Sequence, residues 1–480
     1  MIYDLLEPKF RNAINADRPK RVRKAEWTAK VEIFLDLLVH ESGLIQPDGD
    51  TTYVLPHLTF EEYLAACYLA EQEDVEAAHA CWSEGGDRWH EPLLLLMGCL
   101  RLQTKHKQVY EWLSLLLDET VGKDEKTKAQ CQRDAILAGA CYRDLGGRRY
   151  MQDRWHIRKV DALETRLCTS LLAVLEHPDP ESLLPLRIEA GATLGHLGDP
   201  RIPVTLDAWR RELASPSEIF GQPTGYWCFV RSGEYHIGGW EKDQPSSIIQ
   251  TSAFWIARFP ITVAQYTSFV TQGYGKSAER WWTQEGWVWK GKRTQPWGWD
   301  RLEYRGHNQP VVGVTWYEAT AFCAWLTEQL RTALPTGYVI RLPSEAEWEA
   351  AAAYDTQMEQ RSYPWGNDDP TQERAIYDTS LLRSPAPVGC CPAGAAACGA
   401  LDFSGNVWEW TTSSHRGYPI QSGDLVKGFT SNDCNVPLRG GSWYDNSINI
   451  HCKVRKRDHP DVDNLFDNRG LRVCLTPGII

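Results

Sequence analysis

Three short runs near the C-terminus constrain the fold of this chain most: GNVWEW at 405–410, RGGSW at 439–443 and NRGLRV at 468–473. Gly405 and Asn406 tolerate positive φ, so they predict a tight turn before a strand whose two tryptophans share one face. The two glycines of the second run indicate a bulge or a close approach of two backbone segments. The third run opens the last predicted strand, so we expect a small, tryptophan-rich sheet to close the chain.

Helix starts of one kind precede these runs. In each, a hydroxyl residue stands three positions before Gln or Glu, the pattern of a capping box, in which each side chain bonds the other residue's backbone amide. The pairs are Thr262 with Gln265, Thr315 with Glu318, and Ser344 with Glu347. Apolar residues then recur at helical spacing, as at Ala319, Phe322, Cys323 and Leu326. We therefore expect amphipathic helices before the sheet.

Together these segments resemble a known family. The chain reads, in order, GEYHIGG, FPITVAQYTSFV, QPVVGVTWYEATAFCAWL, RLPSEAEWEAAAA, YPWGND, GNVWEW, RGGSW and NRGLRV. Over residues 226–476 this series resembles the formylglycine-generating, sulfatase-modifying-factor family. The resemblance implies a C-type-lectin-like fold with few regular elements and much irregular, ordered loop.

The beginning of the chain has a different composition and predicts helices. Sixteen of the 22 tryptophans follow residue 225. Thr59 and Glu62 fit a capping box in HLTFEEYLAACYLA. This segment resembles the helical region that follows the nucleotide-binding core in NACHT-type signalling ATPases, and we assign residues 1–125 to such a region.

Residues 126–215 are also expected to be helical. LRIEAGATLGHLGDPR at 186–201 resembles one repeat of the HEAT type, and 129–146 resembles a degenerate copy. Stacking needs several repeats, so a generic helical bundle is the alternative. The predicted class is α+β, with an all-α N-terminal region followed by the lectin-like domain.

The sequence predicts no nucleotide hydrolysis. Gly275, Lys276 and Ser277 match the end of a phosphate-binding loop, G-x-x-x-x-G-K-[ST], but the first glycine is replaced by Val270. A separate signalling ATPase is therefore a candidate partner of this chain.

Charge and hydropathy exclude several classes of partner. The net charge of -12 and the pI near 5.6 argue against nucleic acid and anionic membranes, which basic surfaces bind. The N-terminus lacks the apolar core of a signal peptide, and no apolar stretch reaches membrane-spanning length. We expect a cytoplasmic protein whose fourteen cysteines are mostly reduced.

The residues at the family's catalytic positions argue against an enzyme. In the resembled family, two cysteines after the GGS run bind the metal; the corresponding positions here are Asp445 and Ile450, and Cys452 is the only thiol nearby. A second enzymatic branch joins sulfur to histidine derivatives at an iron site that needs an H-x-x-x-H-x-E pattern. Residues 1–225 lack that spacing. A formylglycine-generating-type oxidase or another modifying enzyme is kept as the alternative, and an assembly scaffold for a separate ATPase is the second.

Recognition of an unknown protein or small ligand is the function that the sequence favours. The segment after Trp443 mixes aromatic, acidic, amide and apolar side chains without helix or strand period, a composition suited to an adaptable contact surface. The predicted ligand-binding residues are Tyr444, Asp445, Asn446, Ser447, Ile448, Asn449, Ile450, His451, Lys456, Asp458, His459, Phe466 and Asp467. A fixed binding surface and a diversified one both fit this set.

Members of this fold also serve as variable proteins of diversity-generating retroelements. Adenine mutagenesis of AAC template codons there gives codons that end in C, and all eight residues of 444–451 can be encoded in this way, whereas Lys456 cannot. A diversified sensor surface is therefore one hypothesis for this segment.

Two further segments carry open alternatives. Six tryptophans lie in 281–299, which we interpret as a hairpin whose Trp287 and Trp289 cover the core, with an aromatic or sugar site as the alternative. No cofactor is expected, although the Asp- and Asn-rich stretch 458–468 leaves room for a structural calcium ion.

Overall fold

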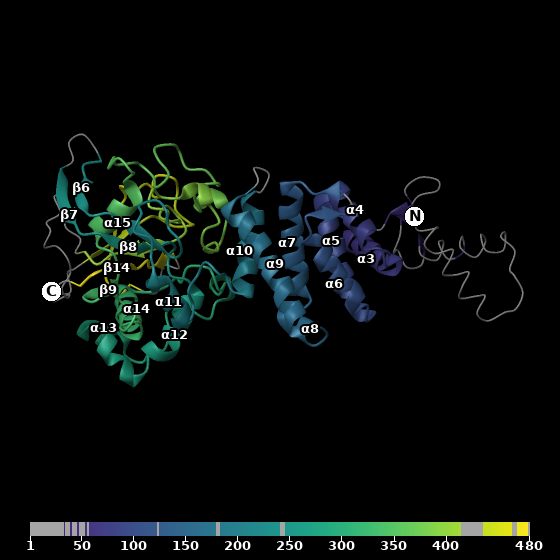
Figure 1. Ribbon diagram of the computed structural model, residues 1–480, viewed down its shortest axis with the longest axis horizontal. Coiled ribbons are helices and arrows are strands. Elements are labelled where there is room, and N and C mark those ends of the chain that lie inside the picture. Colours follow the sequence, from purple (N-terminus) through teal and green to yellow (C-terminus); the bar gives the residue numbers. More distant parts are fainter. Residues whose placement is uncertain are drawn as a thin grey trace, which may run out of the picture. The chain divides into compact units, whose positions relative to one another are not determined.

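The computed structural model forms two compact units, Met1–Leu163 and Glu164–Ile480 (Figure 1). The structure describes residues 57–121, 124–178, 183–240, 245–413, 435–462 and 468–478, together with 33, 39, 40, 46, 47, 53 and 54. Within these residues, no helix is long and apolar enough to cross a membrane.

The first unit is built from helices. They are α3 (Leu58–Gln72), α4 (Val75–Gly85), η1 (Gly86–Trp89), α5 (His90–Leu102), α6 (His106–Leu116), α7 (Lys128–Asp144) and α8 (Gly147–Gln152), with the two-residue strands β1 (Gln46–Pro47), β2 (Tyr53–Val54), β3 (Thr120–Val121) and β4 (Asp124–Glu125). Helix α9 (Ile157–Glu176) spans the boundary between the units. The capping box predicted at Thr59 is wrong, because α3 begins two residues earlier than that cap requires, with His57 as an N-cap that makes no side-chain cap bond.

A buried carboxylate ties the helices of the first unit together. Asp134 is fully buried on α7 and accepts hydrogen bonds from Trp82 Nε1 (2.8 Å) and Gln130 Nε2 (2.5 Å). Lys126 Nζ and His79 Nε2 each lie 2.7 Å from its second oxygen. Four partners from α4, α7 and the chain before α7 thus satisfy one charge that would otherwise be costly to bury.

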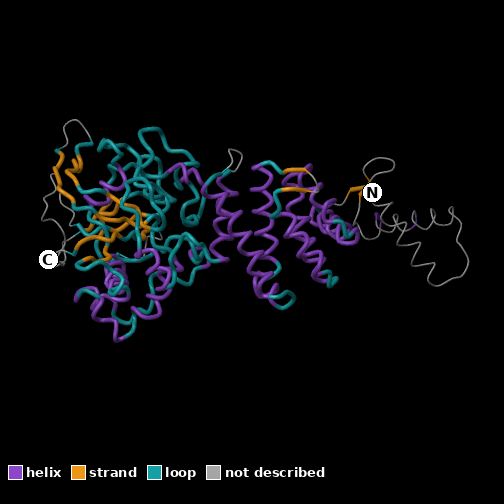
Figure 2. The backbone as a smooth tube through the Cα atoms, viewed as in Figure 1, coloured by secondary structure: helices purple, strands orange, loops and turns teal. Residues whose placement is uncertain are grey.

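The second unit combines helices, two small sheets and long loops (Figure 2). Its helices are α10 (Leu184–Leu197), α11 (Leu206–Ala214), α12 (Val263–Gly273), η2 (Lys276–Trp281), α13 (Gln284–Lys290), η3 (Leu302–Tyr304), α14 (Trp316–Gln329), α15 (Glu345–Ala353), η4 (Asp378–Ser380) and η5 (Pro392–Gly394). The capping boxes predicted at the starts of α12, α14 and α15 are all present, with both reciprocal bonds. These helices therefore begin where the sequence pattern places them.

Two four-stranded sheets and a hairpin complete this unit. The first sheet has the order β5 (Trp227–Val230), β8 (Phe254–Ala257), β14 (Cys474–Pro477), β9 (Tyr338–Arg341), and α14 packs beside β9. The second has the order β12 (Lys456–Asp458), β11 (Val436–Arg439), β10 (Trp408–Trp410), β13 (Arg469–Gly470), with β13 parallel to β10. Strands β6 (Gly233–Gly238) and β7 (Ser246–Thr251) form the hairpin. The class is α+β, as the sequence predicts.

The turn residues behave as their types require. Gly405 and Asn406 have φ of 81° and 61°, and a Cβ on Gly405 would stand 2.1 Å from the Ile376 carbonyl oxygen. Gly440 has φ of 100°, and a Cβ there would stand 2.7 Å from the Phe403 oxygen. The positive φ expected at Gly405 and Asn406 and the close backbone approach expected at Gly440 are therefore confirmed.

The tryptophan-rich segment does not form the hairpin that the sequence analysis predicts. Thr283 caps a short helix, α13, by accepting the Gly286 amide proton. Trp287 and Trp289 are partly buried against the main core. The Thr283 hydroxyl satisfies a free amide at a helix start, which favours a helix over a strand here.

Candidate recognition site

The segment after β11 is fixed at Asp445 by hydrogen bonds, one of them from a side chain of strand β10. Trp408 Nε1 donates to Asp445 Oδ2 at 2.8 Å, and the Ser442 hydroxyl donates to the same oxygen. Asn468 Nδ2 donates to Ser442 Oγ at 3.0 Å. Asp445 was predicted as a ligand contact, but its carboxylate is used to hold the loop in place.

The residues that follow alternate between exposed and covered positions. Tyr444 and Ile448 are 73% and 71% exposed, and Asn446 between them is exposed too. Asn446 Oδ1 accepts the amide protons of Ile448 (3.2 Å) and Asn449 (3.3 Å) and so shapes the turn. Ser447 and Asn449 are partly exposed. We call the outward side chains of Tyr444, Asn446 and Ile448 the recognition face.

Ile450 does not belong to this face. It is 0% exposed and packs with Tyr363, Ala375 and Tyr377. Its prediction as a ligand contact is therefore wrong, because the turn that exposes Ile448 directs Ile450 into the domain. An isoleucine gives no sign in the sequence of which side it faces.

His451 is half-buried at the end of the same segment. Its Nδ1 accepts the Lys453 amide proton at 2.9 Å, and its ring lies 5.4 Å from Trp240 and 5.1 Å from Tyr363. Burial lowers the pKa of His451 to about 4, with help from nearby cations. The ring is thus neutral at pH 7 and supports the loop from below.

Strand β12 carries two of the remaining predicted residues, Lys456 and Asp458, and His459 follows it directly. Lys456 Nζ lies 5.3 Å from the Trp408 ring centroid, and burial lowers the pKa of that amine. Asp458 accepts Arg469 Nε at 2.9 Å, and His459 Nδ1 lies 2.5 Å from Asp461 Oδ1. These groups engage other side chains of the domain. Phe466 and Asp467 lie outside the described residues.

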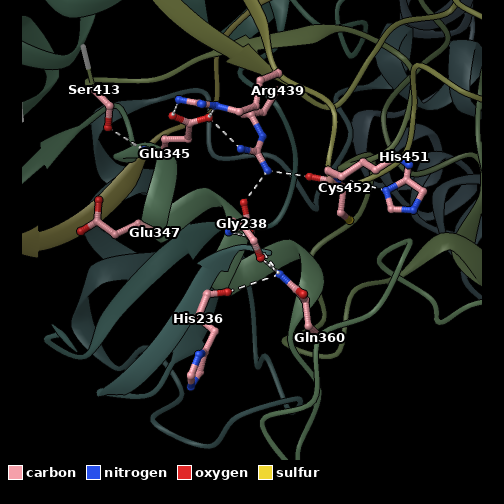
Figure 3. A network of polar contacts seen from close by, with 12 residues as sticks. His236, Gly238, Glu345, Glu347, Gln360, Ser413, Arg439, His451 and Cys452 are labelled. Atoms are coloured by element: carbon pink, nitrogen blue, oxygen red, sulfur yellow. Dashed lines mark hydrogen bonds and ion pairs between the residues drawn. The ribbon is translucent and has the colours of Figure 1, made fainter. Parts of the chain in front are cut away.

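An arginine clamp, made of Arg439 with Glu345, Glu349 and the Cys452 carbonyl, holds the segment from behind (Figure 3). Arg439 Nη1 donates to Glu345 Oε1 and Nη2 to Glu349 Oε2, both at 2.8 Å; Nη2 also donates to Cys452 O at 2.5 Å. Arg439 ends β11 and Cys452 follows the recognition face, so the clamp fixes both ends of the loop. The sequence does not predict this clamp, although Glu345 and Glu349 stand i, i+4 on one predicted helix.

The two clamped carboxyls differ in acidity. Burial favours the neutral form of each, but Arg439 and a second cation, Arg455, hold the pKa of Glu345 below its usual value. Glu349 has only Arg439 nearby, so burial dominates and its pKa is raised. Gln360 Nε2 (3.1 Å) and the Gly238 amide (2.9 Å) donate to Glu349 Oε1.

The donor set of this site does not fit the family's metal centre. The sequence resemblance assigns the two cysteine positions to Asp445 and Ile450. Asp445 is bonded to Trp408 and Ser442, and Ile450 is buried. Burial raises the pKa of the nearby Cys452 thiol to about 12. Among the described residues, no group of three His, Cys, Asp or Glu side chains is arranged to hold a metal ion.

Comparison with known proteins agrees with this architecture. Residues 216–476, more than half of the chain, match the sulfatase-modifying factor enzyme 1-like domain. The chain belongs to this family. Residues 2–69 match the winged helix-turn-helix domain C-terminal to NACHT. The second unit therefore has the family's C-type-lectin-like fold, preceded by a module of NACHT-type proteins.

The relatives include both active and inactive proteins. Hercynine oxygenase of Mycolicibacterium thermoresistibile is 37% identical over 254 residues, covering 49% of this chain and 53% of the relative. That of Mycobacterium tuberculosis is 36% identical over 251 residues, covering 49% and 55%. Inactive C-alpha-formylglycine-generating enzyme 2 of Bos taurus is 31% identical over 191 residues, covering 37% and 52%. The chain thus spans about half the length of these curated relatives.

Solved structures of the same kind are more distant in sequence. Treponema denticola variable protein 1 is 20% identical, with a TM-score of 0.39, covering 52% of this chain and 95% of that chain. PvdO from Pseudomonas aeruginosa is also 20% identical, with a TM-score of 0.38, covering 52% and 93%.

Proposed function

We propose that this chain is a non-catalytic, cytoplasmic sensor whose lectin-like domain binds a protein or ligand through the recognition face. One observation carries the proposal: Asp445 is fixed and Ile450 is buried at the positions that the resemblance assigns to the catalytic cysteines, while Tyr444 and Ile448 beside them are more than 70% exposed. Exposed tyrosine supplies contact area at low entropic cost, which suits recognition. Asp445 and Ile450 are thus unsuited to catalysis at the positions where an enzyme needs reactive groups. Tyr444 and Ile448 beside them are exposed, as contacts with a partner require.

Photo-crosslinking tests this directly. A benzophenone amino acid at position 444 of the full chain should crosslink a defined partner in extracts of the source cells. Position 302 is the matched control, because Leu302 is 83% exposed at a different site of the same domain. Adding Ile448→Ser should weaken capture by roughly tenfold or more, the effect of about 1.4 kcal/mol. Equal crosslinking from positions 444 and 302, or no effect of Ile448→Ser, would refute the proposed face.

An enzymatic role is the second candidate, since the sequence identity to hercynine oxygenases reaches 37%. The experiment is oxygen consumption by the full chain with hercynine or a cysteine-containing peptide, after loading with iron or copper. We expect no turnover above metal alone. Turnover that depends on the protein would establish the enzyme and overturn the first proposal.

Two refinements of the sensor proposal remain separable. A near-identical repeat of the codons for 439–473 in the coding locus, with AAC at the differing positions, would support a diversified face; its absence would leave a fixed one. The match of residues 2–69 to a NACHT-associated module favours a separate signalling ATPase as the downstream partner. Co-purification of this chain with such an ATPase tests the hypothesis that the chain is an assembly scaffold for it.

A further inference from the structure

Helix α10 lies unusually close to the lectin-like domain, within the same compact unit. A Cβ on Gly191 would stand 2.8 Å from Pro387 Cβ, and one on Gly195 would stand 2.4 Å from Asn308 Oδ1. Asn308 Nδ2 donates to the Gly191 carbonyl at 2.7 Å. Only glycine permits this approach, so a shift of the domain at these contacts must displace the helix as well.

Arg187 anchors the same helix to the domain backbone. Its side chain is 3% exposed. Its Nε donates to the Cys390 carbonyl at 2.8 Å, and its Nη2 to the Gln372 carbonyl at 3.3 Å. Because both acceptors are backbone atoms, a shift of the segment around Gln372 must move or strain the guanidinium.

The segment 370–380 is a single folded piece. Gln372 Nε2 donates to the Thr379 carbonyl at 2.6 Å, and Tyr377 OH donates to the Pro370 carbonyl at 3.0 Å. These bonds connect its first residues to its last. We call it the connecting segment.

The connecting segment also contacts the loop that carries the recognition face. The Asp378 amide donates to the Asp445 carbonyl at 3.0 Å. Ile450, which closes the recognition loop, packs against Ala375 and Tyr377. One segment therefore contacts the loop of the recognition face at two points and the anchor of α10 at a third.

We propose that helix α10 senses the state of the recognition face through the connecting segment, so that contact at Tyr444 and Ile448 alters the seating of α10. This regulation rests on the proposed binding function. The connecting segment carries this coupling. It contacts Asp445 and Ile450 at one end and accepts a hydrogen bond from Arg187 at the other. Coupling of this kind is reciprocal, so changing Arg187 must affect the recognition loop as much as the reverse.

Hydrogen exchange of the full chain, without any ligand, tests the coupling. Ile450→Ala should speed amide exchange in α10 by at least about threefold, because local opening follows the loss of packing. Ile340→Ala is the matched control: Ile340 is 2% exposed on β9, and it lies in a different buried cluster from Ile450. Arg187→Gln should in turn speed exchange across 444–450.

Equal exchange of α10 in the Ile450→Ala and Ile340→Ala variants would overturn the proposal. If Ile450→Ala does not fold, Ile450→Val and Arg187→Gln give the same comparison with smaller perturbations. The result is independent of partner capture. If hydrogen exchange shows the coupling but crosslinking captures no partner, the binding function is refuted and the link between α10 and the loop stands. If a partner is captured but exchange shows no coupling, only that link is refuted.

Discussion

Replacing the arginine of the clamp offers the sharpest test of how the recognition loop is held. Arg439, Glu345 and Glu349 are each at most 1% exposed, so Arg439→Met would leave the Glu349 carboxyl buried without its cation. Breaking a buried pair on one side costs about 3–5 kcal/mol. Methionine keeps an unbranched, flexible stem in place of the arginine stem, so packing along that stem is largely retained. We expect a loss of that size in unfolding free energy at pH 7, measured by denaturant titration of the domain's tryptophan fluorescence.

The stability lost in Arg439→Met should depend on pH in a defined direction. The pKa of Glu349 is already raised above its ordinary value of 4.5, and losing Arg439 raises it further. A carboxyl with a raised folded-state pKa destabilises the fold when charged, so stability returns as pH falls from 8 through that pKa. Glu345 keeps Arg455 (Nη2 to Oε2, 2.6 Å) and should change little.

A second substitution separates charge from packing. Adding Glu349→Gln to Arg439→Met removes the stranded charge and should recover at least about half of the lost free energy. The reasoning fails if Arg439→Met costs less than about 1 kcal/mol. It also fails if the loss is the same at pH 8 and pH 5, or if Glu349→Gln recovers nothing.

Three further outcomes follow from other parts of the chain. Asp134→Ala should cost the first unit about 3–5 kcal/mol, because Lys126 stays buried without its carboxylate; thermal unfolding followed by circular dichroism measures it, and a change below 1 °C would contradict it. Gly405→Ala should lower stability by at least about 1–3 kcal/mol, since φ is 81° and the Ile376 oxygen blocks the new methyl; Gly275→Ala, at an open site with negative φ, is the control in the same denaturant titration. His451, with its pKa lowered to about 4, contributes stability above its unfolded pKa that is lost as pH falls through the folded one. His451→Gln should therefore flatten stability between pH 4 and 6.5, and an NMR titration of the ring near 6.5 would refute the shift.

Features that depend on neighbouring residues, such as helix caps and turns, could be predicted from the sequence. A capping box is set by two residues and their spacing, so Thr262, Thr315 and Ser344 could be placed as N-caps, and the structure confirms all three. The positive φ of Gly405 follows from residue type in the same way. Thr59 shows the limit of that rule, because the helix there starts one residue before it.

What the sequence did not decide depends on contacts between distant segments. Ile450 faces inward because Tyr363 and Tyr377 surround it, and both lie more than 70 positions away in the chain. The arginine clamp joins β11 to α15 in the same manner. Short-range patterns carry no record of such pairings, so the sequence predicts the irregular backbone of 444–450 but does not separate its inward from its outward side chains.

The alternation along 444–450 has an evolutionary consequence. Tyr444, Asn446 and Ile448 project from a loop whose shape depends on Asp445, Ile450 and the clamp. Substitutions of Tyr444 and Ile448 leave every bond of the framework in place, so their effect on stability should stay within about 0.5 kcal/mol. Mutation can therefore vary these two side chains without first having to restabilise the domain.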